Sequence, residues 1–240
     1  MTTPRFYRPM LLLWTLWLAI PPLTAQQVPI VVGRMSEVMW QGQLQGKISL
    51  DTLADKAHLY GLGPLAYLAG EILVLDGRAY RSVVTSPTDM QVTATWDLEA
   101  PFFGYARIAE WQEQELPKDV NSLIQLENYL DQWAKNRSEP FFFKIKAWVD
   151  EATIHVVNLP KGSTVSSPDE AHRGLTKYPI RAAAVDILGF YSRHHKAILT
   201  HHDTNMHLHL ITADRLKMGH LDDLQLRAGT ARVYLPGGKN

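Results

Sequence analysis

Three histidines near the C-terminus have the types and spacing of metal ligands. They lie in "HLHLITADRLKMGH", at positions 207, 209 and 220. On a β-strand, side chains alternate between two faces, so His207 and His209 project the same way, about 6 to 7 Å apart along the chain. The turn before Gly219 can return the chain antiparallel and place His220 opposite the pair. Three neutral imidazoles leave coordination positions open, as in catalytic zinc sites, so we predict that His207, His209 and His220 bind Zn2+.

Other histidines nearby leave two alternatives open. Exposed histidines on a strand can be without function, and the neighbouring "HHD" provides a rival ligand set or an acceptor that orients a ligating imidazole. The pair in "SRHHK" lies in a basic turn, where we expect surface residues. The residues concerned are His194, His195, His201, His202 and Asp203.

Composition indicates an ordinary globular protein with one large domain or two small ones. The chain has 240 residues, of which 46% are hydrophobic and 20% are charged. Lys+Arg and Asp+Glu both number 24, so no basic field exists to attract nucleic acid or anionic lipid. There are no cysteines, and any metal must therefore be held by nitrogen and oxygen ligands.

The first 25 residues have the layout of a signal peptide. Arg5 and Arg8 precede an apolar run over residues 10–20, and two prolines and Ala25 follow. The run is too short to cross a bilayer comfortably, so we expect cleavage near Ala25, export to the periplasm or the exterior, and no stable membrane anchor. The alternative is an uncleaved anchor. Cleavage leaves 22 basic and 24 acidic residues, a formal charge of −2.

Hydrophobic patterning predicts an α+β protein with two β-rich halves and a few helices. "LYGLGPLAYLAGEILVLDGRAYRSVV" contains tight turns between β-rich stretches, and its "LDG" is typical of a hairpin turn. Apolar residues spaced by three and four predict a helix over 118–136. "FFFKIKAWVD" and "TIHVVNLP" are expected to form a hairpin with an acidic turn. We therefore divide the mature chain into an N-terminal part, 26–137, and a C-terminal part, 138–240, that carries the histidines.

Two separated motifs resemble the α-acetolactate decarboxylase family. "HLHLITADRLKMGHLDDLQL" is similar to the family's zinc-binding segment, in which H-x-H is followed by an acidic-arginine turn and, after ten residues, by a further histidine. "LYGLGPLAYLAGEILVLDGRAY" is similar to its glycine-rich segment followed by "GE" and "LDG", and "GFYS" at 189–192 also matches. The resemblance covers residues 41–236, and it implies a fold of two mixed sheets.

The resemblance implies a zinc-dependent lyase that converts 2-acetolactate, or a related 2-hydroxy-3-oxo acid, to acetoin and CO2. Loss of CO2 from such an acid leaves electrons on the ketone oxygen, and a zinc ion that chelates the substrate's oxygens stabilises the resulting enediolate. A positioned acid must then deliver one proton to carbon. By resemblance, Glu71 in "GEILVLDG" is the active-site glutamate, whereas Asp76 is expected to be structural.

The chain departs from the family pattern at two places. The family's strand motif, similar to "TRTVPRQ", carries an arginine that is believed to hold the carboxylate or to act in protonation, and Val157 in "HVVNLPKG" stands in its place. The family's C-terminal tail supplies a further glutamate, for which we expect no counterpart here, since the sequence reaches only Asn240. Losing one such electrostatic group typically lowers a rate by about 10²- to 10³-fold.

Three functional hypotheses follow. The first is the exported zinc lyase, and the second is a catalytically impaired homologue that binds a metal or a small carboxylated ligand. A metal-assisted hydrolase is the third, and the absence of H-E-x-x-H and G-x-S-x-G motifs counts against it. The sequence leaves open whether the chain forms a homodimer.

Overall fold

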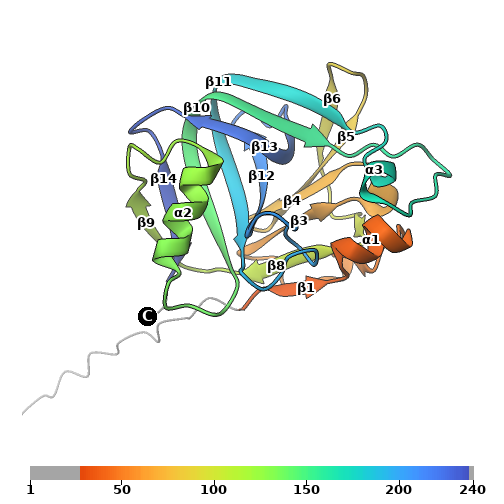
Figure 1. Ribbon diagram of the computed structural model, residues 1–240, viewed down its shortest axis with the longest axis horizontal. Coiled ribbons are helices and arrows are strands. Elements are labelled where there is room, and N and C mark those ends of the chain that lie inside the picture. Colours follow the sequence, from red (N-terminus) through yellow and green to blue (C-terminus); the bar gives the residue numbers. More distant parts are fainter. Residues whose placement is uncertain (1–27, 238–240) are drawn as a thin grey trace, which may run out of the picture.

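Two six-stranded β-sheets, a two-stranded pair and a few short helices make up the described part of the chain (Figure 1). The computed structural model describes residues 28–237, so the predicted signal peptide lies outside the described residues. Within them, no helix has the length and apolar character needed to span a membrane. The predicted fold class is confirmed, with the refinement that all pairings between the named strands of residues 28–237 are antiparallel.

The first sheet is formed by the N-terminal half and has the strand order β1-β8-β3-β4-β5-β6. Its strands are β1 (Ile30–Val32), β3 (Leu59–Pro64), β4 (Glu71–Leu75), β5 (Arg78–Val84), β6 (Met90–Ala94) and β8 (Phe103–Arg107). The predicted "LDG" hairpin joins β4 to β5, and Asp76 and Gly77 have φ angles of 47° and 75° there. Positive φ at both central residues defines the tight turn that suits a two-residue hairpin. A short pair, β2 (Ile48–Ser49) and β7 (Glu99–Ala100), lies beside this sheet.

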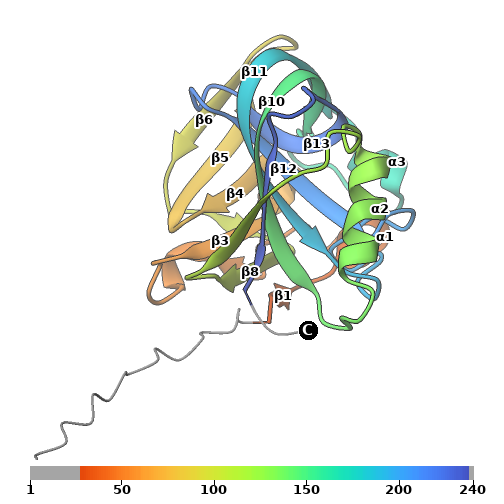
Figure 2. The same ribbon diagram turned by 90° about the vertical axis from the view of Figure 1, so that its left-hand side faces the viewer.

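The second sheet is built around two long strands, and four of its strands close into a ring of pairings (Figure 2). Its members are β9 (Trp111–Glu115), β10 (Phe141–Val156), β11 (Thr176–Tyr191), β12 (Met206–Thr212), β13 (Met218–Leu226) and β14 (Arg232–Pro236). β10 pairs with β11, β11 with β12, β12 with β13, and β13 with β10. This ring brings strands that are distant in sequence, β10 and β13, side by side.

The predicted hairpin within residues 141–160 is wrong, because β10 runs through the acidic stretch as one strand of 16 residues. The register between β10 and β13 shifts between Val149 and Glu151, which leaves Asp150 as the extra residue of a bulge. A bulge bends a strand without ending it. The bend lets β10 pair with β14 in its first half and with β13 in its second half.

The helices are short. They are α1 (Met35–Gln41), α2 (Leu123–Trp133), α3 (Pro168–Ala171) and the 3-10 turns η1 (Leu50–Thr52) and η2 (Ala66–Leu68). α2 begins later than the predicted residue 118, because the Ser122 hydroxyl accepts the Gln125 N–H and the Gln125 side chain accepts the Ser122 N–H. This capping box fixes the start of the helix.

A hydrophobic core between the two sheets joins them face to face. Leu62 and Leu73 of the first sheet belong to the same buried cluster as Phe142, Leu188 and Phe190 of the second. A second cluster lies on the other face of the second sheet and includes Leu126 and Leu130 of α2. β9, from the predicted N-terminal part, pairs with β14 in the second sheet, and the division at residue 137 stays a prediction.

Candidate metal centre

The hairpin of β12 and β13 brings the three predicted histidine ligands together. His209 is paired with His220 across the two strands, and His207 projects from the same face of β12 as His209. On the opposite face, Met206, Leu208 and Leu210 enter the core beneath α2. One ring nitrogen from each histidine can be chosen so that all three lie within 4.8 Å of one another. These three residues could therefore hold a metal ion.

The distances and hydrogen bonds within this group fit a zinc ion. The Nε2 atoms of His207 and His209 are 3.2 Å apart, close to the ~3.3 Å between two nitrogens that share one tetrahedral zinc at about 2.0–2.1 Å. His207 Nδ1 lies 2.6 Å from the carbonyl oxygen of Leu199. Since a carbonyl only accepts, Nδ1 carries the hydrogen, and the lone pair is on Nε2, where a metal would need it.

Gly219, just before His220, is required by the close approach of β10. A Cβ atom built at this residue would lie 2.4 Å from the carbonyl oxygen of His155 on β10. Only glycine allows the two backbones to come this close. The pairing of His155 with His220, which sets the position of the third imidazole, therefore depends on Gly219.

We expect Gly219→Ala to destabilise the protein by about 1–3 kcal/mol, because the new methyl group must push β13 away from β10. Chemical denaturation measures this change, and zinc binding should weaken in parallel as His220 moves. Gly237→Ala is the matched control, because its Cβ would meet no atom closer than 3.9 Å. Equal stability of the two variants would contradict the packing argument.

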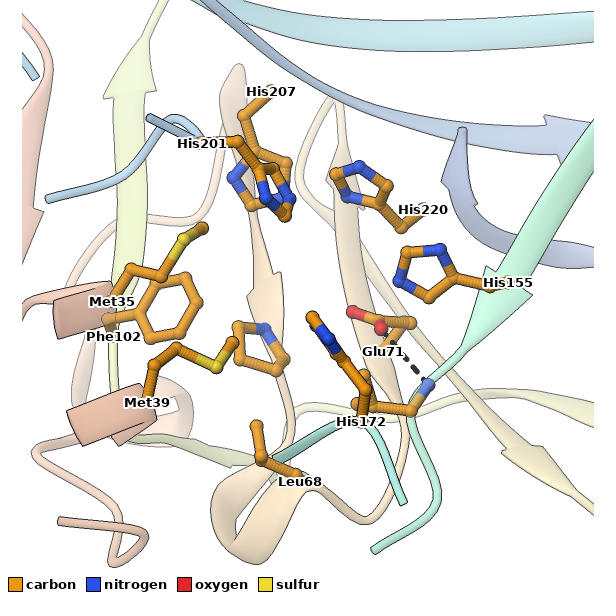
Figure 3. A pocket seen from close by; sticks show the side chains of 12 residues that line it. Met35, Met39, Leu68, Glu71, Phe102, His155, His172, His201, His207 and His220 are labelled. Carbon is orange, nitrogen blue, oxygen red and sulfur yellow. Dashed lines mark hydrogen bonds between the residues drawn. The ribbon is translucent and has the colours of Figure 1, made fainter. Parts of the chain in front are cut away.

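Glu71, at the start of β4, faces the histidines from the first sheet (Figure 3). Its side chain is buried, with Oε2 at 3.6 Å from His209 Nε2 and Oε1 accepting the backbone N–H of Val157 at 3.3 Å. Burial raises the pKa of Glu71 well above its usual value; the Val157 hydrogen bond opposes this and Asp222 adds to it. A buried carboxyl group with a raised pKa beside candidate ligands is typical of a functional site.

The three histidines are held in the neutral form that a metal requires. Burial lowers the pKa of His207 and His220 well below the usual value, and neighbouring imidazoles lower it further. Burial, with a smaller contribution from His155, lowers the pKa of His209 to about 3. Neutral imidazoles keep their lone pairs available at neutral pH.

The free energy of unfolding of the metal-free protein should rise with pH up to about pH 6.5. In the unfolded chain these histidines take up protons below about pH 6.5, whereas in the fold they do so only at lower pH. Each contributes a slope of up to about 1.4 kcal/mol per pH unit between its folded and unfolded pKa. Glu71 contributes a slope of opposite sign above about pH 4.5, because its pKa is higher in the folded protein than in the unfolded chain. The slope of one carboxyl group is smaller than the summed slope of three imidazoles. Urea denaturation with a chelator from about pH 5 to about pH 7 measures the slope, and a flat or falling curve would contradict this reading.

The cavity beside the three histidines is small, about 30 Å³, and its wall combines apolar and imidazole side chains. α1 supplies Met35 and Met39 from one side (Figure 3). Among the rival ligands, His201 lines the cavity, with ring centroids 5.1 Å from His220 and 6.4 Å from His207, but it lies outside the group of three. His202 and Asp203 are exposed.

Sequence reasoning missed His155 and His172, both of which line this cavity. His155 lies on β10 two residues before Val157, so strand periodicity places both residues on one face. That signal was available in the sequence. The position of His172, after the short helix α3, depends on how the loop between β10 and β11 folds. No spacing between His172 and the other histidines in the sequence predicts that it reaches the cavity.

Val157 itself is buried and lines the cavity, and its backbone N–H is the donor to Glu71. No lysine or arginine among residues 28–237 lines this cavity. Lys161, the nearest lysine after Val157 in sequence, is exposed and lines a different pocket. The basic side chains around the candidate metal centre are therefore imidazoles rather than a guanidinium.

Comparison with known proteins identifies the family. The sequence profile of the family described as alpha-acetolactate decarboxylase matches residues 32–235. Solved structures share the fold: α-acetolactate decarboxylase from Bacillus subtilis strain 168 has 17% identity and a TM-score of 0.71, covering 88% of this chain and 86% of its own. The enzyme from Bacillus subtilis subspecies spizizenii has 18% identity and a TM-score of 0.72, with coverage of 88% and 87%. A Staphylococcus aureus protein of unknown function, described as similar to α-acetolactate decarboxylase, has 16% identity and a TM-score of 0.71, with coverage of 89% and 87%.

No curated protein matches the sequence. The family match covers most of the chain, including Glu71 and the three histidines, and the fold agrees with it. This chain belongs to the α-acetolactate decarboxylase family.

Proposed function

We propose that this protein is a zinc-dependent carboxy-lyase that converts 2-acetolactate, or a related 2-hydroxy-3-oxo acid, to the hydroxyketone and CO2. The observation that carries the proposal is the convergence of the ring nitrogens of His207, His209 and His220, with Glu71 beside His209, next to a cavity that His207, His220 and Glu71 line. Membership of the α-acetolactate decarboxylase family supports the reaction class.

The reaction sets two requirements for the site. The bond between C2 and the carboxylate carbon breaks, its electron pair moves toward the ketone oxygen, and one proton must be added at carbon. A zinc ion held by the three histidines would supply Lewis-acid stabilisation of the developing negative charge. The protein must supply the proton and keep bulk water away from the reacting carbon.

Glu71 is the group placed to deliver that proton. It is buried, it lies beside His209, and the Val157 N–H fixes one of its oxygens and leaves the other facing the histidines. Met35, Met39, Leu68 and Phe102 form an apolar wall that excludes water. The histidine ligands remain neutral, and the Leu199 carbonyl orients the ring of His207.

Incubation of the purified, zinc-loaded protein with racemic 2-acetolactate tests the proposal. We expect release of acetoin and CO2 in equal amounts, at a rate that falls when a chelator removes the metal. Full zinc occupancy without acetoin or CO2 release would overturn the proposed reaction and leave the metal site intact.

A second function, binding without turnover, is favoured by one observation. Val157 occupies the place of the family arginine, and no other guanidinium or ammonium group of residues 28–237 lines the cavity. A protein of this kind would bind a metal or a small carboxylated ligand. Turnover that is lost in Glu71→Gln, with fold and zinc retained, would exclude it.

We further propose that the protein is exported after cleavage near Ala25, on the basis of the N-terminal sequence alone. Expression of the full chain in a bacterium, followed by N-terminal sequencing, tests this. A mature N-terminus near Gln26 in the exported fraction supports the proposal, and an uncleaved chain retained in the cell contradicts it.

A further inference from the structure

Apart from the candidate metal ligands, His155 is the imidazole of the cavity wall whose contacts fix its position best. It lies near the end of β10, opposite His220 on β13, and the two rings stack with centroids 4.7 Å apart and planes inclined by 29°. Its side chain is only 10% exposed. Figure 3 shows His155 beside Glu71, with one ring nitrogen turned toward the space between them.

Asp222 fixes the orientation of this ring. His155 Nδ1 lies 2.5 Å from Asp222 Oδ1, and Lys177 Nζ lies 3.0 Å from the other oxygen of Asp222. Asp222 follows His220 by two residues on β13, and its carboxylate is largely buried, with 19% of the side chain exposed. A largely buried carboxylate that pairs with both a lysine and an imidazole holds the ring in one position.

The hydrogen bond to Asp222 also determines which ring nitrogen is an acceptor. A carboxylate only accepts, so Nδ1 of His155 carries the hydrogen, and in the neutral ring the lone pair is then on Nε2. Asp222 does not line the cavity that His155 lines, and Nε2 is on the side of the ring away from Nδ1. The acceptor nitrogen therefore faces the cavity.

His155 lies outside the group of three whose ligand atoms are within 4.8 Å of one another. Its Nε2 is therefore available to a molecule in the cavity that His155 lines. A 2-hydroxy-3-oxo acid with an ionised carboxylate has several oxygen acceptors but one hydrogen-bond donor, the hydroxyl group on C2. An imidazole acceptor beside Glu71 is complementary to that hydroxyl group.

We propose that His155, held by Asp222, accepts a hydrogen bond from the 2-hydroxyl group of the substrate and selects for acids that carry it. This inference rests on the proposed function and deepens it by assigning the residue that recognises the hydroxyl group. His155 stands two residues before Val157, which directly follows the end of β10, and both residues line the cavity. The chain thus has an imidazole close to the position where the family arginine is missing.

Two unreactive ligands separate hydroxyl recognition from general binding. They are 2,3-dihydroxy-2-methylbutanoate and its analogue without the 2-hydroxyl group, 3-hydroxy-2-methylbutanoate. Calorimetry on the zinc-loaded protein measures the affinity for each, with no dependence on turnover. We expect the wild-type protein to prefer the first ligand, and His155→Phe to reduce that preference about tenfold, the effect of one lost hydrogen bond. Binding of the second ligand should change by less than about twofold.

Three further variants sharpen the test. His155→Gln, whose amide oxygen can accept, should restore part of the preference. Asp222→Ala, which removes the hydrogen bond that orients the ring, should reduce the preference for the first ligand several-fold. His172→Phe changes another imidazole in the same cavity and should leave the ratio of the two affinities unaltered.

Zinc content and thermal melting of each variant complete the experiment. His155→Phe should retain one zinc per chain, and loss of that zinc would show that His155 is a ligand and overturn the inference. An unchanged preference in a folded, zinc-loaded His155→Phe protein would overturn it while leaving the proposed function standing. Failure of the zinc-loaded wild-type protein to bind either ligand would overturn both.

Discussion

His207→Ala combined with His209→Ala is expected to abolish stoichiometric zinc binding. The two residues supply the pair of Nε2 atoms that lie 3.2 Å apart, and a single remaining imidazole does not form a specific zinc site. Loss of one group that hydrogen-bonds to a metal ligand already lowers the metal affinity about 10- to 100-fold. The loss of two ligands should lower the zinc affinity by more than this. Metal analysis after dialysis against a zinc buffer measures the occupancy.

The matched control replaces two exposed histidines, His194 and His202. His194→Ala with His202→Ala removes the same number of imidazoles from the same region of the sequence and should leave one zinc per chain. The two double variants should also differ in decarboxylation, which only the first should lose. Equal zinc content in both variants would show that the metal binds elsewhere.

Glu71→Gln is expected to retain zinc and to lower kcat by about 10²- to 10⁴-fold, the usual contribution of a positioned acid or base. The amide oxygen can still accept the Val157 N–H, so β4 and β10 should stay in place. The variant also removes a carboxyl group whose pKa burial raises, so folding should not suffer at neutral pH. Steady-state kinetics with 2-acetolactate, together with zinc analysis, measure the two effects separately.

Glu110→Gln is the control for Glu71, because Glu110 is exposed on the surface. It should leave kcat and zinc content unchanged. A wild-type kcat in the Glu71→Gln enzyme would show that Glu71 is not the proton donor. The proton would then have to come from another group in the cavity. His155 and His201 are imidazoles of that wall outside the three candidate ligands, with ring centroids 4.7 Å and 5.1 Å from that of His220.

Local patterns predicted the elements that carry the candidate ligands. The alternation of histidine with Met206, Leu208 and Leu210 placed the imidazoles on one face of β12, and the "LDG" turn placed Asp76 and Gly77 in a hairpin. Both predictions depend on residues within one or two strands, where side-chain periodicity and turn chemistry act directly.

Features that depend on pairing between distant strands could not be predicted in the same way. The acidic pair at 150–151 was expected to form a turn, but pairing with β11 along its whole length carries β10 through a bulge. The separate pairing of β10 with β13 brings His155 against His220, 65 positions later in the sequence. No local spacing encodes that contact, which is why Asp222 and His172 escaped the sequence-based reasoning; for His155, the local signal was its i, i+2 spacing to Val157, which that reasoning did not use.

X-ray absorption spectroscopy of the zinc-loaded wild-type protein tests the central claim most directly, because it counts the ligands around the metal. Three imidazole nitrogens at about 2.0–2.1 Å with at least one non-protein oxygen are predicted, which leaves room for a substrate. A fourth imidazole or a protein carboxylate that closes the coordination sphere would contradict the account.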